Sequence, residues 1–324
     1  MGRRGNGEGS ITRRKDGLYM ARYTIETPAG PKRKALYAKT CEEVAKKLAD
    51  ALSNRNNGFL FDDENMTVGE YLTRWLEDSA KGDLAPRTYS NYRLQVRRHI
   101  VPALGRKKLS KLSPVNIQVL YATKLREGLK PSSVRFIHAV LHRALDQVVK
   151  WNMIPRNPAA AVDTPKVRQE GITPLDSAQA LTFLNAARAD RYEALYVLCL
   201  TAGLRMGEAL GLKWSDMNLD AGTLRVNRQL QRIHWGDSEA SKLVFSEPKN
   251  ASKRTLDLPQ TALASLKRHR KKQLEEKLRA GGAYEDNGLI FATTKGTPLD
   301  AQNVVNRHFK PLLRSAKLPN VQLA

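Results

Sequence analysis

Apolar and polar positions along the 324-residue chain follow three different patterns in succession. Residues 10–39 contain short runs rich in aromatic and β-branched residues, separated by turn signals, which is the pattern of a small sheet. Thr40 and Glu43 then form a capping box, and apolar residues at helical spacing continue over 44–52. The first segment is therefore predicted to be a three-stranded sheet followed by one helix.

The second segment, residues 66–152, has apolar residues at helical spacing throughout. Its four helical stretches start at residues that favour helix N-termini, namely Thr67 with Glu70 as a second capping box, Pro86, Ser113 followed by Pro114, and Pro131. This pattern predicts an all-α domain of four amphipathic helices. Linkers precede and follow it at 55–65 and 152–174, and the second of them contains four prolines.

The third segment combines helices with a small antiparallel sheet. Helical stretches come first and last, and alternating strand patterns lie between them at 222–233, 241–249 and 253–260. We expect a multidomain protein that is mainly α with small antiparallel sheets. Its three domains are predicted at residues 1–60, 66–152 and 170–324.

The charge of the chain points to a polyanionic partner. Lys and Arg total 55 against 32 Asp and Glu, which gives a net charge of +23. Residues 1–60, 61–168 and 169–324 carry +7, +9 and +7, so the excess is spread over all three segments. Such a distribution favours nucleic acid as the partner, with an anionic membrane surface as the second choice.

Composition favours a location inside the cell. Only two cysteines occur, which argues against a disulfide framework and fits a reducing compartment. The first ten residues lack the apolar core of a secretory signal, and the longest apolar run, residues 194–204, is too short to span a membrane. We therefore expect a cytoplasmic, DNA-associated protein.

The first segment carries basic residues on or beside its strands. A sheet can present side chains to a DNA groove, so these residues are candidates for DNA contact. The alternative is that they only make the surface of the sheet more soluble. The candidates are Arg13, Arg14, Lys15, Arg22, Lys32, Arg33 and Lys34.

The helical domain offers further candidates where its helices begin, because helix N-termini attract phosphate groups. These candidates are Arg87, Thr88, Lys130, Ser132 and Arg135. His138 and His142 lie one helical turn apart and could bind a metal ion, but no clear third ligand is near them in the sequence. We therefore expect no metal site.

One arginine stands between two apolar runs, in the stretch 201–217. Gly203 is expected to end the preceding buried helix, which places Arg205 in the first turn of the next one. Glu208 lies three residues on, shares the same helix face and can hold the guanidinium in place. A half-buried arginine with a spare pair of donors suits a phosphate. The alternative is an ordinary Arg–Glu surface pair.

Lys249 is the second candidate for chemistry. It is predicted at the turn between the strands at 241–249 and 253–260, at the tip of a hairpin. A lysine there can donate a proton to a leaving oxygen if neighbouring positive charge lowers its pKa. The alternative is a solvated turn lysine.

These residues resemble motifs of the tyrosine recombinases, the phage integrase family. Residues 200–220 are similar to the motif of the first catalytic arginine, and residues 247–259 are similar to the hairpin of the catalytic lysine. The helical segment resembles the core-binding domain of these enzymes, and the N-terminal sheet and helix resemble their arm-type DNA-binding domain. The likeness covers essentially the whole chain.

The resemblance implies site-specific DNA strand cleavage and rejoining through a phosphotyrosine link. In these enzymes a tyrosine attacks the scissile phosphate, two arginines hold its non-bridging oxygens, and a lysine protonates the leaving oxygen. The resemblance assigns Arg205 as the first arginine, Glu208 as its supporting acid and Lys249 as the lysine. It implies no metal or nucleotide cofactor. It implies double-stranded DNA as the partner, at core sites and at arm sites, with self-association into a dimer or tetramer on the DNA.

The resemblance breaks off near residue 320. The family continues there into a His-x-x-Arg motif and then the nucleophilic tyrosine, and the 324 residues contain neither. Tyr284 precedes the last predicted helix, and His308, with Pro311 three residues on, is interpreted as a helix-surface residue. We therefore expect a truncated recombinase that binds DNA but does not cleave it. The alternatives are a non-catalytic regulator at recombination sites and a topoisomerase-like enzyme with the same catalytic fold.

Overall fold

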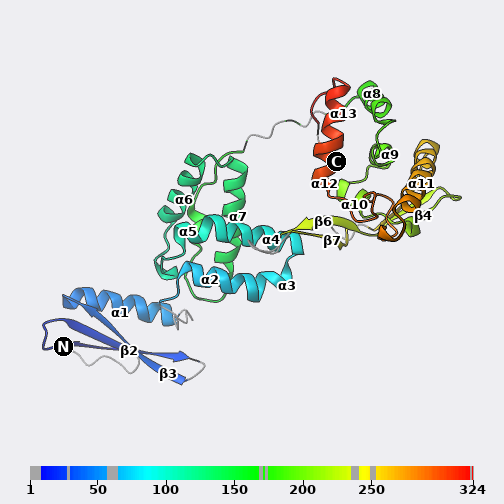
Figure 1. The fold of residues 1–324 in the computed structure, drawn as a ribbon. Coiled ribbons are helices and arrows are strands. Elements are labelled where there is room, and N and C mark those ends of the chain that lie inside the picture. The colour runs from blue at the N-terminus through cyan, green and yellow to red at the C-terminus, as the bar shows by residue number, and fades with distance from the viewer. Residues whose placement is uncertain are drawn as a thin grey trace. The chain divides into compact units, whose positions relative to one another are not determined.

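The structure is a computed structural model, drawn in Figure 1. It describes residues 9–27, 30–56, 65–167, 171, 174–234, 241–248, 253–321 and 323. The chain forms two compact units, Met1–Arg168 and Gln169–Ala324. In the part of the chain that the structure describes, no helix is long and apolar enough to cross a membrane.

The first unit begins with an antiparallel sheet and a helix, as its aromatic and β-branched runs and its capping box predicted. The sheet has the order β1-β2-β3, and its elements are β1 (Ser10–Arg13), β2 (Tyr19–Thr27), β3 (Gly30–Ala38) and the following helix α1 (Cys41–Asn56). The Thr40 hydroxyl accepts a hydrogen bond from the backbone N–H of Glu43, 3.2 Å away, so it caps α1. Val44 and Leu48 of α1 are buried against Ala21 of the sheet. This small apolar core fixes which face of the sheet α1 covers.

The rest of the first unit is helical. Its helices are α2 (Val68–Trp75), α3 (Lys81–Asp83), α4 (Pro86–Gln95), α5 (Val101–Leu104), α6 (Pro114–Arg126) and α7 (Pro131–Lys150). A π-helical turn joins α2 to α3 and another joins α4 to α5, so these elements form two continuous helices, and with α6 and α7 they make the four predicted ones. Thr67 and Ser113 cap α2 and α6 in capping boxes. The first part of the predicted linker 152–174 belongs to this fold, because Ile154 and Val162 are buried in the same apolar core.

The second unit packs helices around two small sheets. Its elements are α8 (Ser177–Ala187), α9 (Glu193–Ala202), α10 (Met206–Leu210), β4 (Met217–Asn218), β5 (Thr223–Val226), β6 (Gln229–Ile233), β7 (Lys242–Ser246), β8 (Arg254–Asp257), α11 (Gln260–Ala280), α12 (Ala301–Val304) and α13 (Lys310–Ser315). The aromatic rings of Phe183, Tyr196 and Phe309 meet in its core, with centroids 5.2 to 5.9 Å apart. The mainly α fold with small antiparallel sheets agrees with the prediction.

The strand pairing of the second unit differs from the prediction. The pattern at 222–233 forms two strands in separate sheets, because β5 pairs with β4 and β8 while β6 pairs with β7. Asn227 and Arg228, between β5 and β6, both donate hydrogen bonds to the buried carboxylate of Asp216. The predicted hairpin between 241–249 and 253–260 is therefore wrong, since β7 and β8 belong to different sheets.

Candidate active site and nucleic-acid interface

The candidate site is built where α9 ends. Most of this helix is buried, including Leu195, Tyr196 and Leu198. Gly203 ends it with a φ of +59°, a left-handed backbone conformation that would strain a residue with a side chain. The chain then turns and Arg205 becomes the N-cap residue of α10. The prediction that Gly203 ends the helix is confirmed, and Arg205 lies just before the first turn of α10 rather than within it.

Glu208 contacts Arg205 from the side of the apolar core. Its side chain is 1% exposed, whereas that of Arg205 is 65% exposed. The carboxylate accepts a hydrogen bond from the Arg205 backbone N–H at 3.1 Å and one from Arg205 Nη1 at 3.2 Å. Arg205 was expected to be half-buried, and this expectation is wrong, because an N-cap side chain projects away from the core that the following turn enters. The Arg205 guanidinium is therefore exposed to solvent while Glu208 holds it in place.

A second arginine, which the sequence did not indicate, shares the same carboxylate. Arg254 at the start of β8 donates to Glu208 through Nη1 at 3.2 Å and through Nη2 at 2.8 Å. Burial pushes the pKa of Glu208 up, but the hydrogen bonds from Arg254 and Arg205 outweigh it and leave the pKa below its ordinary value. Glu208 is thus a buried anion held between two cations. Arg254 is 46 residues from Glu208 in the sequence. The only local feature that marks Arg254 is its basic side chain at a half-buried position of a strand.

Lys249 itself lies outside the described residues. The residues on either side of its segment are described, and the ammonium of Lys253 lies 2.7 Å from the carboxylate of Glu247. In the sequence, residues 249–252 stand between β7 and β8, and Arg254 follows shortly after them.

The other residues considered for chemistry have partners of their own. The Tyr121 hydroxyl lies 2.9 Å from Nδ1 of His138, and the ring of His142 lies 3.0 Å from Asp146. In the described ranges, no three His, Cys, Asp or Glu side chains come together as metal ligands would. His308, interpreted from the sequence as a helix-surface residue, is half-buried with its Nδ1 3.0 Å from Asp190. Its side chain is 35% exposed, and its ring lies edge-on to that of the buried Tyr192 with centroids 4.7 Å apart.

The basic residues of the N-terminal sheet divide between its two faces. Residues opposite one another in an antiparallel pair have side chains on the same face. Arg22 lies opposite Ala35, and Arg33 lies opposite Thr24, on the face that points away from α1. Lys34 lies opposite the buried Tyr23, on the α1 side.

The remaining candidates of this sheet follow the same register. Arg13 and Lys32 lie in register with Tyr19 and Ile25, on the α1 side, and the Arg13 guanidinium stands 5.7 Å from the centre of the Tyr19 ring. Arg14 and Lys15 lie at the turn after β1, where Arg14 forms an ion pair with Asp16. Arg22 and Arg33 therefore occupy strand positions on the face opposite α1, and the Arg14 guanidinium reaches the same face, 5.4 Å from the centre of the Tyr37 ring.

Two helices of the helical domain begin without a side-chain cap. Within the described residues, neither Ala85 before α4 nor Lys130 before α7 provides one, and neither first turn contains an acid. Arg87, Lys130 and Ser132 are exposed there, as is Arg135 one turn further on, and Thr88 is half-buried. The rings of Tyr92 in α4 and Phe136 in α7 are 5.9 Å apart, which brings the two helices together. Uncapped N–H groups beside basic side chains are well suited to binding phosphates.

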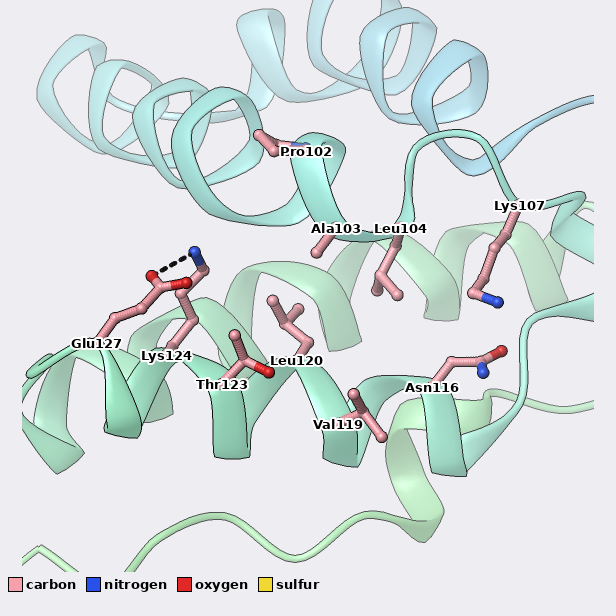
Figure 2. A pocket seen from close by; sticks show the side chains of 10 residues that line it. All are labelled: Pro102, Ala103, Leu104, Lys107, Asn116, Val119, Leu120, Thr123, Lys124 and Glu127. Carbon is pink, nitrogen blue, oxygen red and sulfur yellow. Dashed lines mark hydrogen bonds and ion pairs between the residues drawn. The ribbon is translucent and has the colours of Figure 1, made fainter.

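A hollow of about 390 Å³ lies between α5 and α6 (Figure 2). Ala103, Leu104 and Leu120 give it an apolar wall, and Lys124 and Glu127 at its rim are joined by an ion pair of 2.7 Å. With Lys107, a third charged residue of the lining, the hollow carries a net charge of +1.

Comparison with known proteins gives a consistent result. The family model described as "Phage integrase, N-terminal SAM-like domain" matches residues 67–125, and that described as "Phage integrase family" matches residues 173–321. A tyrosine recombinase XerC-like protein of Caldanaerobacter subterraneus subsp. tengcongensis is 28% identical over 301 residues, covering 89% of this chain and 77% of the relative. An integrase of Streptomyces ambofaciens is 30% identical over 289 residues, covering 86% of this chain and 71% of the relative.

Solved structures share the fold. The Tn1549 transposon integrase in complex with a circular intermediate DNA superposes with a TM-score of 0.63 at 19% identity, over 78% of this chain and 79% of that one. A lambda integrase tetramer bound to a Holliday junction superposes with a TM-score of 0.58 at 20% identity, over 96% of this chain and 85% of that one.

Proposed function

This chain belongs to the phage integrase family of tyrosine recombinases, and on that basis we propose that Arg205, Glu208 and Lys249 form part of a site for DNA strand cleavage and rejoining. The observation that carries the proposal is the exposed guanidinium of Arg205 on its buried Glu208 support. Arg205 binds a non-bridging oxygen of the scissile phosphate, where negative charge grows in the transition state. Lys249 gives its proton to the leaving 5′ oxygen as the phosphotyrosine link forms.

The three segments divide the DNA contacts between them. Residues 1–60 bind arm sites, residues 66–152 bind the core site through the starts of α4 and α7, and residues 170–324 hold the scissile phosphate. Double-stranded DNA is the partner, and copies of the chain assemble on it as a dimer or tetramer. The protein acts on DNA in the cytoplasm.

A protein made of these 324 residues should bind core DNA without cleaving it. Tyr284 is the last tyrosine in the sequence and precedes α12 and α13. Burial raises the pKa of its hydroxyl, and Asp286 adds to the effect. Cleavage therefore depends on a segment that carries the family's second arginine and its tyrosine.

The test is a suicide substrate, a nicked core site that traps the covalent intermediate. We expect the 324-residue protein to bind it and to form no covalent adduct. Fusion to the C-terminal segment of a related integrase should produce an adduct that is lost in the variants Arg205→Ala and Lys249→Ala. An adduct formed by the unfused protein and mapped to Tyr284 would contradict the proposal. A fusion that binds DNA but never cleaves would favour a non-catalytic regulator of recombination sites.

A further inference from the structure

The two arginines on Glu208 are not equivalent. Arg254 is 30% exposed and donates to both carboxylate oxygens, at 2.8 and 3.2 Å. Arg205 is 65% exposed and its side chain makes one contact, from Nη1 to Oε1 at 3.2 Å. Arg254 is therefore the main side-chain partner of the carboxylate, and Arg205 touches it with one edge only.

A buried carboxylate needs this pairing. Glu208 is 1% exposed, and an ionised carboxylate that deep is costly unless hydrogen bonds and an opposite charge satisfy both of its oxygens. Carboxylates and phosphates compete for the same two-pronged face of an arginine. If Arg205 were the only cation available, Glu208 would draw its guanidinium inward. The same donors would then be lost to a DNA phosphate.

We propose that Arg254 is a positioning residue, which satisfies Glu208 and so leaves the Arg205 guanidinium turned outward for a DNA phosphate. The inference rests on the proposed role of Arg205. Two arginines on one carboxylate also leave a net charge of +1 at the site, whereas an Arg205–Glu208 pair alone would be neutral. Arg254 thus preserves both the orientation and the charge that phosphate binding requires.

The position of Arg254 in the fold gives it a second effect. It is the first residue of β8, where it lies in register with the fully buried Val226 of β5. Lys249 precedes it by five residues in the sequence. The ion pair therefore ties the start of β8, directly after the segment that carries Lys249, to the N-terminus of α10 that carries Arg205.

The binding test compares variants of matched charge on a duplex of one fixed sequence at low salt. Arg254→Gln should weaken binding by about tenfold, the worth of a hydrogen bond to a charged group, and no more than Arg205→Ala does. Arg225→Gln is the control, because Arg225 is exposed on the neighbouring strand β5, opposite Thr255, and its loss removes the same charge. Equal binding by Arg254→Gln and Arg225→Gln would overturn the inference.

A double variant separates positioning from a purely structural role. If Glu208 captures Arg205 in the absence of Arg254, then neutralising Glu208 as well should release Arg205. Glu208→Gln combined with Arg254→Gln should therefore bind more tightly than Arg254→Gln alone. If the loss is structural, the second substitution should make binding weaker still. Thermal unfolding of each variant shows which of them remain folded.

The pH dependence offers a further readout. Glu208 faces Arg205 and Arg254, and the Cys199 thiol of α9 also interacts with its charge. In Arg254→Gln the carboxylate loses its main partner, so it should become protonated at higher pH and let go of Arg205. The affinity of Arg254→Gln relative to the native protein should therefore recover as the pH falls toward the ordinary glutamate pKa, where Glu208 takes up a proton. A ratio that stays constant with pH would count against the inference.

A crystal structure of the Arg254→Gln variant shows, without DNA, whether Arg254 sets the orientation of Arg205. We expect Arg205 to rotate inward and donate two hydrogen bonds to Glu208. An Arg205 that keeps its single Nη1 contact and its exposure would overturn the inference. If the native protein binds no DNA, the proposed function fails, while the crystal structure still decides whether Arg254 sets the orientation of Arg205.

Discussion

At the scale of single residues, a buried carboxylate explains why an arginine after an apolar helix can be both fixed and exposed. The spacing of Arg205 and Glu208 was sufficient to predict their contact, because residues three apart at a helix start lie side by side. The exposure of Arg205 and the presence of Arg254 could not be predicted. The exposure follows from the position of Arg205 as the N-cap residue of α10, and Arg254 reaches Glu208 from β8, 46 residues away, so no local pattern carries that information.

The two partners of this ion pair should differ strongly in their effect on stability. Glu208→Ala leaves Arg254, which is 30% exposed, without its main partner and should cost about 2–4 kcal/mol in the free energy of unfolding. Arg205→Ala removes a side chain that is 65% exposed and should cost about 0.5 kcal/mol or less. Urea unfolding of the two variants measures the difference. Equal effects would mean that Glu208 is not the buried anchor that the structure shows.

The pH dependence of the same group has a definite sign. The pKa of Glu208 in the folded protein lies below its ordinary value of 4.5. Its contribution to stability is therefore fully present above that value and is lost as the pH falls through the folded pKa. The stability advantage of the native protein over Glu208→Gln should be constant from neutral pH to about pH 5 and should shrink below it. An advantage that grows on acidification would have the wrong sign.

At the scale of secondary-structure elements, helices were easier to predict than strand partners. Thr67 and Ser113 cap their helices as expected, because a cap is a local hydrogen bond within four residues. The alternation over 222–233 was also a correct sign of strands. It could not show that the run is divided between two sheets at Asn227 and Arg228, where both side chains form hydrogen bonds with Asp216. Strand pairing is set by contacts distant in sequence, so the predicted hairpin was wrong although both of its strands exist.

The register of the N-terminal sheet leads to a prediction about its two faces. If the face opposite α1 enters a DNA groove, Arg22→Ala or Arg33→Ala should each weaken arm-site binding by about 1–3 kcal/mol, the range of a good base contact. Lys32→Ala and Lys34→Ala are matched controls, since they remove the same charge from the α1 side and should have smaller effects. The measurement is the affinity of the full chain for DNA selected to bind it. Larger losses at the two lysines would place the DNA on the other face.

At the scale of the whole molecule, positive charge is spread over segments that each have an apolar core of their own. Separate clusters of buried residues lie in the N-terminal sheet and α1, in the helical domain, and in the second unit. Each segment can therefore hold its basic residues in place independently. A basic tail on an otherwise neutral enzyme would give a binding protein with one contact region, whereas this distribution gives several.

Two footprints on DNA are therefore expected, and one of them should depend on the N-terminal segment alone. Deleting residues 1–60 removes +7 of the net charge of +23 and leaves the apolar cores of the helical domain and of the second unit complete. The shortened protein should lose the arm footprint and keep the core footprint. The dependence of log K on log salt should also become shallower, by about 0.9 for each phosphate that the deleted segment neutralises. Nuclease footprinting and salt titrations of both proteins measure these effects, with circular dichroism to confirm that the shortened protein is folded. Loss of both footprints from a folded protein would show that the segments bind DNA only as one continuous surface.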